Sequence, residues 1–210
     1  DFSTRLNYHQ HLGEIWASGH ELPPTNLVVS GHEKSEAEKR LSKSKVVGDY
    51  VAVVPGAAWV QKQWSADRYA DAIEKIKYGL GMDSIILGSQ KDNICFEIAK
   101  KSTGINLAGK TDLRQAMAVL ANAKHVIGSD TGLVHAAEAL GVPVSMVMGP
   151  TSSETGGGVS LEISGNVECG LWCRPCSQNG KNPCYRSSQI CMESISVNDV
   201  IESIPGQQVF

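Results

Sequence analysis

The stretch from residue 125 to residue 151 constrains the fold more than any other part of the chain. A short apolar run ends at Gly128, a polar turn reads Ser-Asp-Thr-Gly over residues 129–132, and an apolar helical pattern follows up to Leu140. A second apolar run then occupies residues 142–148. This order predicts a strand, a helix and a second parallel strand. It places the helix N-terminus at the carboxyl end of the first strand, where anions bind.

The same alternation extends back to residue 46. Short apolar or β-branched runs predict buried strands, and the helical patterns place apolar residues at intervals of three and four. We expect strands over residues 50–54, 84–87, 105–108, 125–128 and 142–148, and helices opened by Ser65 and over residues 93–101, 113–121, 131–140 and 197–204. This order indicates an α/β fold, a Rossmann-like parallel sheet with helices on both faces.

The first 45 residues lack this alternation and are polar, with two adjacent prolines. They predict an interdomain linker with one charged helix, and the following domain extends over residues 46–210. Within the linker we expect part of an amphipathic helix at Leu12, Ile15 and Trp16, a short strand over 26–30 and the charged helix over 33–44. The opening residues resemble the middle of a protein, so we expect the chain to be a fragment.

Composition excludes several classes of protein. The net charge is −3 and the pI is near 6.1, so there is no basic field to attract nucleic acid. No apolar run approaches the roughly 20 residues that span a bilayer. The chain contains no G-x-G-x-x-G and no G-x-x-x-x-G-K-[ST] motif, which argues against a dinucleotide-dependent dehydrogenase and a P-loop ATPase.

The cysteines are concentrated near the C-terminus. Cys95 stands apart, whereas the other five lie in a cysteine-rich tail at Cys169, Cys173, Cys176, Cys184 and Cys191. The pattern fits a reducing cytosol, with reduced thiols or one or two disulfides as the default. One C-x-x-C with further cysteines nearby also permits zinc or an iron–sulfur cluster, but the second C-x-x-C of a zinc ribbon is missing. We predict no metal and no cofactor, and the state of these thiols stays open.

Lys62 is the candidate catalytic residue, in the loop after the first strand and between Trp59 and Trp64. An ammonium group there can neutralise the charge that develops on a phosphate leaving group. The alternative is an ordinary surface lysine.

The turn over residues 129–132 supplies further candidates. Thr131 and Gly132 offer backbone amides to a phosphate, and Asp130 suits sugar hydroxyls because its own charge would repel a phosphate. His135 lies about one helical turn further on and points the same way. The alternatives are an N-cap role for Asp130 and a structural histidine.

Asp92 follows the second predicted strand, at a position where an acidic side chain can bind ribose hydroxyls. The alternative is an acid at a helix N-terminus that complements the helix dipole, and spacing alone favours it.

Five segments together resemble the ADP-heptose:lipopolysaccharide heptosyltransferases of glycosyltransferase family nine. The segments are PGAAWVQKQW at 55–64, LGSQKD at 87–92, LAGKTDL at 107–113, SDTGLVHAAEALGVP at 129–143 and GPTS at 149–152. Their order and spacing match the family from about residue 46 to residue 204, and the cysteine-rich tail is also similar.

The resemblance implies the C-terminal, donor-binding half of a GT-B glycosyltransferase. It implies that Lys62 binds the donor phosphates and Asp92 the ribose, and that Thr111 lies where backbone groups meet the adenine. It assigns Asp130, Thr131 and Gly132, with His135 alongside, to the sugar and diphosphate.

The implied reaction is the inverting transfer of heptose from ADP-heptose to the lipopolysaccharide inner core. The N-terminal domain that carries the acceptor surface and the acidic base is missing, so we expect donor binding without useful turnover. The implied location is cytoplasmic in a Gram-negative-type bacterium, with peripheral contact at the inner membrane. The alternatives are a GT-B transferase or epimerase that uses a UDP-sugar, and a non-catalytic nucleotide-binding module.

Overall fold

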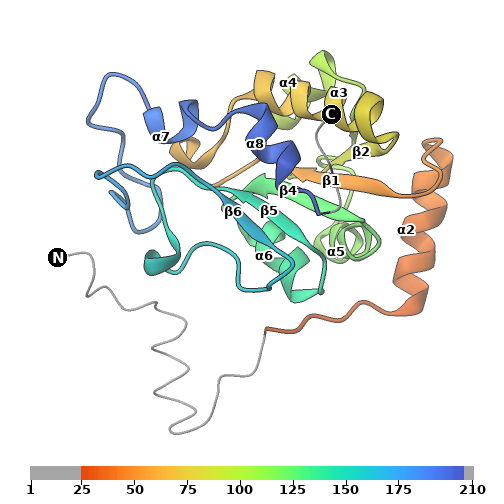
Figure 1. Ribbon diagram of the computed structural model, residues 1–210. Helices are drawn as coiled ribbons and strands as arrows, with labels where there is room; N and C mark the ends of the chain where they lie inside the picture. Colours follow the sequence, from red (N-terminus) through yellow and green to blue (C-terminus); the bar gives the residue numbers. More distant parts are fainter. Residues whose placement is uncertain (1–24, 206–210) are drawn as a thin grey trace, which may run out of the picture.

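The computed structural model describes residues 25–205, and its centre is a six-stranded sheet (Figure 1). All pairings between neighbouring strands are parallel, in the order β3-β2-β1-β4-β5-β6. The strands are β1 Tyr50–Val54, β2 Asp83–Ile86, β3 Ile105–Asn106, β4 His125–Ser129, β5 Val144–Val147 and β6 Gly165–Val167. The predicted parallel α/β sheet is therefore confirmed. The strand order reverses between β1 and β4, which is where ligands bind in open sheets of this kind.

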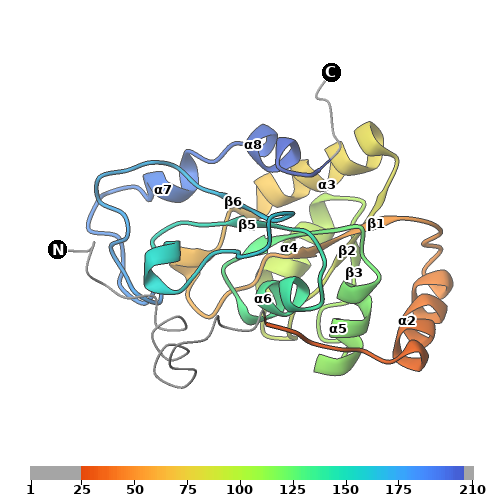
Figure 2. The same cartoon turned by 60° about the horizontal axis from the view of Figure 1, so that its bottom comes forward.

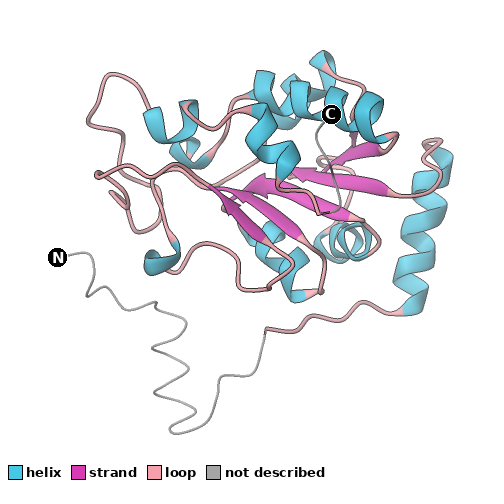
Figure 3. Ribbon diagram, viewed as in Figure 1, coloured by secondary structure: helices cyan, strands magenta, loops and turns pink. Residues whose placement is uncertain are grey.

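Helices cover both faces of the sheet, as Figure 2 shows. The helices α3, α4, α7 and α8 lie with one hydrophobic cluster and α2, α5 and α6 with the other. Their bounds are α2 Gly31–Lys43, α3 Ala66–Leu80, α4 Asn93–Lys101, α5 Leu113–Ala121, α6 Gly132–Ala139, α7 Ile190–Glu193 and α8 Val197–Glu202. Figure 3 shows that long loops join the elements after β5.

Strand β1 illustrates why the sheet is buried on both sides. Its five side chains are all buried and alternate between the two clusters. Val51 and Val53 pack with α3, α4 and α8, whereas Ala52 and Val54 pack with α5 and α6. Because successive side chains of a strand point to opposite faces, a continuous apolar run suits a central strand.

Helix α3 begins where its sequence predicts. Ser65 is the N-cap, and its hydroxyl accepts a hydrogen bond from the amide of Arg68. Gly81 ends the helix in the left-handed conformation, with φ of 69°. The predicted buried face is confirmed, since Tyr69 and Ile76 at its two ends are fully buried.

The structure corrects several predictions of secondary structure. Residues 26–30 are not a strand: the amide of Leu27 donates to the carbonyl of Ala139 in α6, and the segment has no partner strand. Beyond residue 151, where the sequence shows no periodicity, the structure contains β6 and α7. β6 is only three residues long, and its pairing with β5 defines it.

The N-terminal part is only partly described. The segment of Leu12, Ile15 and Trp16 lies outside the described residues. Helix α2 packs through Ala37 and Leu41 into the same cluster as α5. The boundary at residue 46 between linker and domain stays a prediction.

Candidate functional site

Two loops meet where β1 and β4 end. Lys62 follows β1, Asp130 follows β4, and the strands pair in register with Val54 opposite Gly128. The Nζ of Lys62 lies 2.8 Å from Oδ2 of Asp130. Both side chains are largely buried, with 13% and 9% of their surface exposed. Lys62 and the turn over residues 129–132 therefore lie on the same side of the molecule.

Three groups surround the Asp130 carboxylate. Besides Lys62, His135 lies with Nε2 at 3.1 Å from Oδ1, and the hydroxyl of Thr151 donates to Oδ2 at 2.9 Å. Burial of the carboxyl opposes its ionisation, but the hydrogen bonds from His135, Lys62 and Thr151 and the charge of Lys62 outweigh it. The pKa of Asp130 is therefore well below its ordinary value of 3.8, and the site holds a carboxylate.

The loop that carries Lys62 is anchored on both sides of the lysine. Residues 60–62 form a 3-10 turn in which the Lys62 amide donates to the carbonyl of Trp59. Trp64 is fully buried, its indole N–H donates to the carbonyl of Ile195, and its ring makes an edge-to-face contact with Tyr69. Such a contact adds about 0.5–1.5 kcal/mol beyond burial. A fixed Trp64 therefore limits where Lys62 can lie.

The turn after β4 is fastened directly to the end of β1. The hydroxyl of Ser129 donates to the carbonyl of Pro55 and lies 3.1 Å from the hydroxyl of Tyr69. A side chain at Gly128 would come within 2.6 Å of the Val54 carbonyl oxygen, so only glycine permits this approach of the two strands. These contacts set the position of Asp130, which comes next in the chain.

The N-terminus of α6 faces the same edge without a side-chain cap. Thr131, not Asp130, is the N-cap residue, and its side chain makes no capping hydrogen bond. The suggested N-cap role of Asp130 is therefore wrong, since its carboxylate is occupied by Lys62, His135 and Thr151. Gly132 has open space on its Cα. The first amides of α6 are thus available to an anion.

A hollow of about 210 Å³ lies beside this helix end. Asp92 lines it from the loop after β2, with Thr131 and Leu133 from the start of α6, and Gly56 lies so close that a side chain there would overlap the Asp92 carboxyl. Asp92 also accepts a hydrogen bond from the amide of Ser89 at 2.6 Å. It is the N-cap residue of α4 but makes no side-chain capping hydrogen bond, and the Ser89 amide binds its Oδ2 atom.

Thr111 is the least central of the predicted residues. It is half-buried in the loop before α5 and does not line the hollow. Its loop still adjoins the loop that carries Asp92, because the amide of Gly109 donates to the carbonyl of Gly88.

Three residues near the site are not evident from sequence reasoning. The hydroxyl of Thr151 binds Asp130, and the guanidinium of Arg174 donates to the carbonyls of Gly149 and Thr151. Glu138 is buried in α6, and one of its oxygens accepts hydrogen bonds from the amides of Ser160 and Leu161 at 2.5 and 2.7 Å. The sequence pattern of α6 suggests an apolar side at Leu133, Ala136, Ala137 and Leu140, but the buried positions are Val134, Ala137 and Glu138.

The cysteines of the chain are free thiols. Cys95 is buried in α4, and burial raises the pKa of its thiol to about 12. Within residues 25–205, no group of three or more histidine, cysteine or acidic side chains is arranged to hold a metal ion. Among the same residues, no helix combines the length and apolar character needed to cross a membrane.

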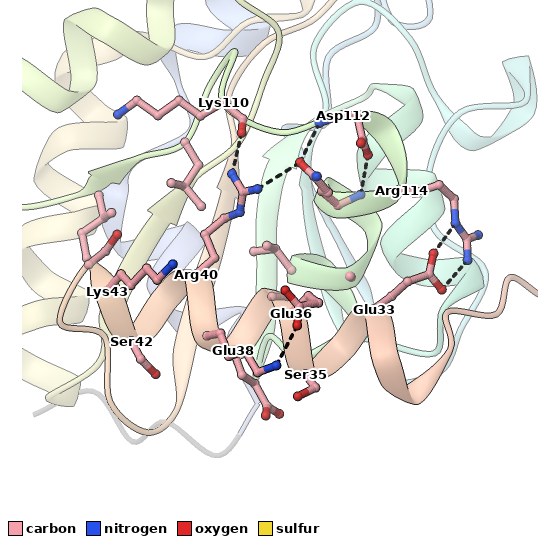
Figure 4. A pocket seen from close by; sticks show the side chains of 18 of the residues that line it. Glu33, Ser35, Glu36, Glu38, Arg40, Ser42, Lys43, Lys110, Asp112 and Arg114 are labelled. Carbon is pink, nitrogen blue, oxygen red and sulfur yellow. Dashed lines mark hydrogen bonds and ion pairs between the residues drawn. The ribbon is translucent and has the colours of Figure 1, made fainter.

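A larger cavity of about 1100 Å³ lies between α2 and α5, away from the carboxyl ends of β1 and β4 (Figure 4). Some of its charged side chains are held by neighbours: Arg114 pairs with Glu33, and Arg40 donates to the Lys110 carbonyl and the Gln115 side chain. The hydrogen bond from Arg114, followed by those from the amide and hydroxyl of Ser30, lowers the pKa of Glu33 to about 2.

A parallel sheet with a lysine–aspartate pair at its switch point, beside an uncapped helix, defines a Rossmann-like ligand-binding domain. The model of glycosyltransferase family 9 (heptosyltransferase) matches residues 15–185, so the chain belongs to this family.

Individual relatives agree with this assignment. The chain is 38% identical over 112 residues to lipooligosaccharide heptosyltransferase 2 of Haemophilus ducreyi, a match that covers 49% of this chain and 32% of the relative. It is 30% identical over 136 residues to lipopolysaccharide heptosyltransferase 2 of Escherichia coli, covering 61% of this chain and 38% of the relative.

Solved structures share the fold. The structure of E. coli ADP-heptose lipopolysaccharide heptosyltransferase II matches with a TM-score of 0.71 and 26% identity, over 88% of this chain and 54% of that one. The family 9 structure from Veillonella parvula matches with a TM-score of 0.75 at 18% identity, over 97% of this chain and 60% of that one. The predicted GT-B fold class is confirmed. The chain spans little more than half of these structures and less than half of the curated relatives that it matches.

Proposed function

We propose that this chain is the donor-binding half of an inverting heptosyltransferase that moves heptose from ADP-heptose to the lipopolysaccharide inner core. The observation that carries the proposal is the Lys62–Asp130 pair at the switch point between β1 and β4. Family membership supplies the reaction class, and the two relatives described above are named for heptosyl transfer to lipooligosaccharide and lipopolysaccharide.

In the proposed complex the diphosphate lies between Lys62 and the N-terminus of α6. The amides of Thr131 and Gly132 donate to its oxygens, and the Lys62 ammonium neutralises the negative charge that grows as the sugar departs. The diphosphate competes with Asp130 for Lys62, and Asp130 keeps His135 and Thr151 as donors. The freed carboxylate oxygen is then placed to accept a hydrogen bond from a sugar hydroxyl.

The nucleoside occupies the neighbouring hollow in this proposal. Asp92 accepts hydrogen bonds from the ribose hydroxyls, and the backbone around Thr111 contacts the adenine at the outer end. An N-terminal domain supplies the acceptor surface and an acidic base that deprotonates the acceptor hydroxyl. Because the acceptor is a glycolipid, the proposed enzyme works at the cytoplasmic face of a membrane and contacts it peripherally.

Calorimetry with ADP, ADP-heptose and UDP tests the donor assignment. We expect ADP to bind and Lys62→Ala to weaken it about 10- to 100-fold, the loss expected for one charge-assisted hydrogen bond. Lys124→Ala is the matched control, because Lys124 precedes β4, lies at the opposite edge of the sheet and is exposed. A preference for UDP would replace ADP-heptose by a UDP-sugar, and no affinity for either nucleotide would overturn the proposal.

Catalysis is tested in an enzyme that contains both halves. Removing one preorganised donor to a leaving group lowers turnover by about 10²–10³. We expect a loss of this order for Lys62→Ala, measured as heptose transfer to a lipopolysaccharide acceptor. Turnover close to that of the unaltered enzyme would exclude Lys62 from the chemistry.

A further inference from the structure

The cysteine-bearing segment, residues 169–191, packs against the Lys62 loop and against the loop that carries Thr151, a hydrogen-bond partner of Asp130. It contacts the Lys62 loop through Gly180 and Gln189, and the loop over residues 149–151 through Arg174. It supplies none of the groups that bind Asp130 directly.

Gly180 lies directly on the side chain of Lys62. A Cβ atom at this position would overlap Cγ and Cδ of Lys62, so the bare backbone of Gly180 forms one wall of the lysine's channel. Gly180 has a φ of 81°, and its amide donates to the hydroxyl of Ser177, which is itself buried. The opposite end of the channel is the Asp130 carboxylate. The methylene chain of Lys62 therefore lies between the backbone of Gly180, which we call the glycine wall, and the Asp130 carboxylate.

Arg174 fixes the loop that carries Thr151. Only 7% of its side-chain surface is exposed, and the guanidinium donates to the carbonyls of Gly149, Thr151 and Cys169 and pairs with Glu168. A planar group with several fixed donors can hold such carbonyls in one arrangement. It thereby fixes the backbone of Thr151, whose hydroxyl binds Asp130.

The backbone of the segment adds to this attachment. The amides of Cys176 and Ser177 both donate to the carbonyl of Pro150, and the side-chain amide of Gln189 donates to the carbonyl of Gln61. One continuous stretch of chain therefore contacts both the Lys62 loop and the loop that carries Thr151.

We propose that the cysteine-bearing segment positions the site, with Gly180 as the positioning residue for Lys62 and Arg174 as the positioning residue for Thr151. What matters for the site is then the path of the segment's backbone over the Lys62 loop. The inference rests on the proposed function only in that Lys62 is taken to bind the donor phosphates. The packing of the segment against Lys62 can be tested without any ligand.

The first test measures how fast Lys62 is acetylated, read by peptide mass spectrometry under trace labelling. In Gly180→Ala the lysine stem or the segment must move, and either movement exposes the ammonium. We expect Lys62 to react at least several-fold faster, with the exposed Lys39 as the internal reference. Gly48→Ala is the matched control, because Gly48 has a φ of 87° but nothing near its Cα. Unchanged labelling of Lys62 in Gly180→Ala would overturn the proposal.

The second test covers the case in which Gly180→Ala simply unfolds. In a Lys62→Ala background the channel is empty, so the added methyl group has room. We expect Gly180→Ala to lower the unfolding midpoint in that background only as much as Gly48→Ala does, and markedly more in the presence of Lys62. Additive effects in this double-mutant cycle would show that the two residues are independent.

The third test measures whether the position held by Arg174 affects ADP binding. Arg174→Met should weaken ADP binding several-fold, and guanidinium added at millimolar concentration should restore part of it. Arg186→Met, in the same segment but with its guanidinium over the rings of Trp172 and Tyr185, should leave ADP binding unchanged. Equal effects of the two variants, or no rescue, would count against Arg174. If the unaltered chain binds no ADP, the proposed function fails. The acetylation rate of Lys62 and the double-mutant cycle still test the packing of Gly180 against Lys62.

Discussion

The ammonium of Lys62 and the carboxylate of Asp130 lie 2.8 Å apart, in loops that follow different strands. The pair holds a positive charge at the switch point of the sheet and keeps it partly shielded from water. Five predictions concern this pair and the packing of the strands and helices around it.

Removing the charge of Asp130 should destabilise the fold. In Asp130→Asn the Lys62 ammonium loses its counter-ion in a largely buried place, and breaking such a pair costs about 3 kcal/mol. The measurement is the free energy of unfolding in urea at neutral pH. The exposed pair of Asp67 with Lys101 is the control, since Asp67→Asn should cost less than about 1 kcal/mol.

The pH dependence of this difference has a defined sign. The pKa of Asp130 is lowered by folding, so its contribution is present above the ordinary value of 3.8 and is lost as the pH falls below it. The gap in stability between the unaltered chain and Asp130→Asn should therefore be constant near neutrality and shrink below 3.8. A gap that stays constant through acid would contradict the assignment of the low pKa.

His125 should control stability in a separate, higher range of pH. It is buried in β4 with Nε2 at 2.6 Å from the hydroxyl of Ser145, and burial lowers its pKa from 6.5 to about 4. Because the unfolded chain binds a proton first, the free energy of unfolding should fall as the pH drops from 6.5 to about 4. His125→Gln, which does not titrate, should flatten the profile in this window. A profile of identical slope in the variant would exclude His125 as its source.

Glu138 should act as an acceptor, and its charge should matter little. Its Oε1 accepts hydrogen bonds from the amides of Ser160 and Leu161, and the carbonyl oxygen of glutamine can accept the same two. Glu138→Ala leaves both amides without a partner, so we expect a loss of about 2 kcal/mol in unfolding free energy, against less than half of that for Glu138→Gln. Equal losses would indicate that the carboxylate charge is what matters.

Gly128 should tolerate no side chain. A methyl group there would come within 2.5 Å of a Val134 methyl carbon and 2.6 Å of the Val54 carbonyl oxygen, so Gly128→Ala should cost at least about 1–3 kcal/mol by overpacking. Gly165→Ala, also in a strand but with open space on its Cα, is the control and should change stability little. Thermal unfolding of the two variants decides the matter. Similar melting temperatures would show that β4 and β1 can separate at no cost.

Local signals explain which elements the sequence could predict. The bounds of α4 and α5 are as expected, and in α5 a reciprocal cap between Asp112 and Gln115 marks the start. Strand β6 could not be predicted, because Gly-Asn-Val has no apolar period and becomes a strand only by pairing with β5. The segment over residues 26–30 failed for the converse reason, since an extended stretch without a partner is not a strand.

Some residues of the site could likewise be predicted from the sequence, and others could not. The meeting of Lys62 with Asp130 could be expected, because the carboxyl ends of neighbouring parallel strands share an edge. The burial of Glu138 could not, since its amide partners lie in an aperiodic loop. The roles of Arg174 and Thr151 depend on contacts between segments that are distant in the sequence. The spacing of residues along the chain therefore does not predict these roles.

The path of residues 169–191 has a consequence for how this protein matures. All six strands precede Cys169, so a chain still emerging from the ribosome can complete its sheet while the glycine wall beside Lys62 is still to be made. The position of the Lys62 ammonium group would then depend on residues that follow every strand of the sheet in the sequence.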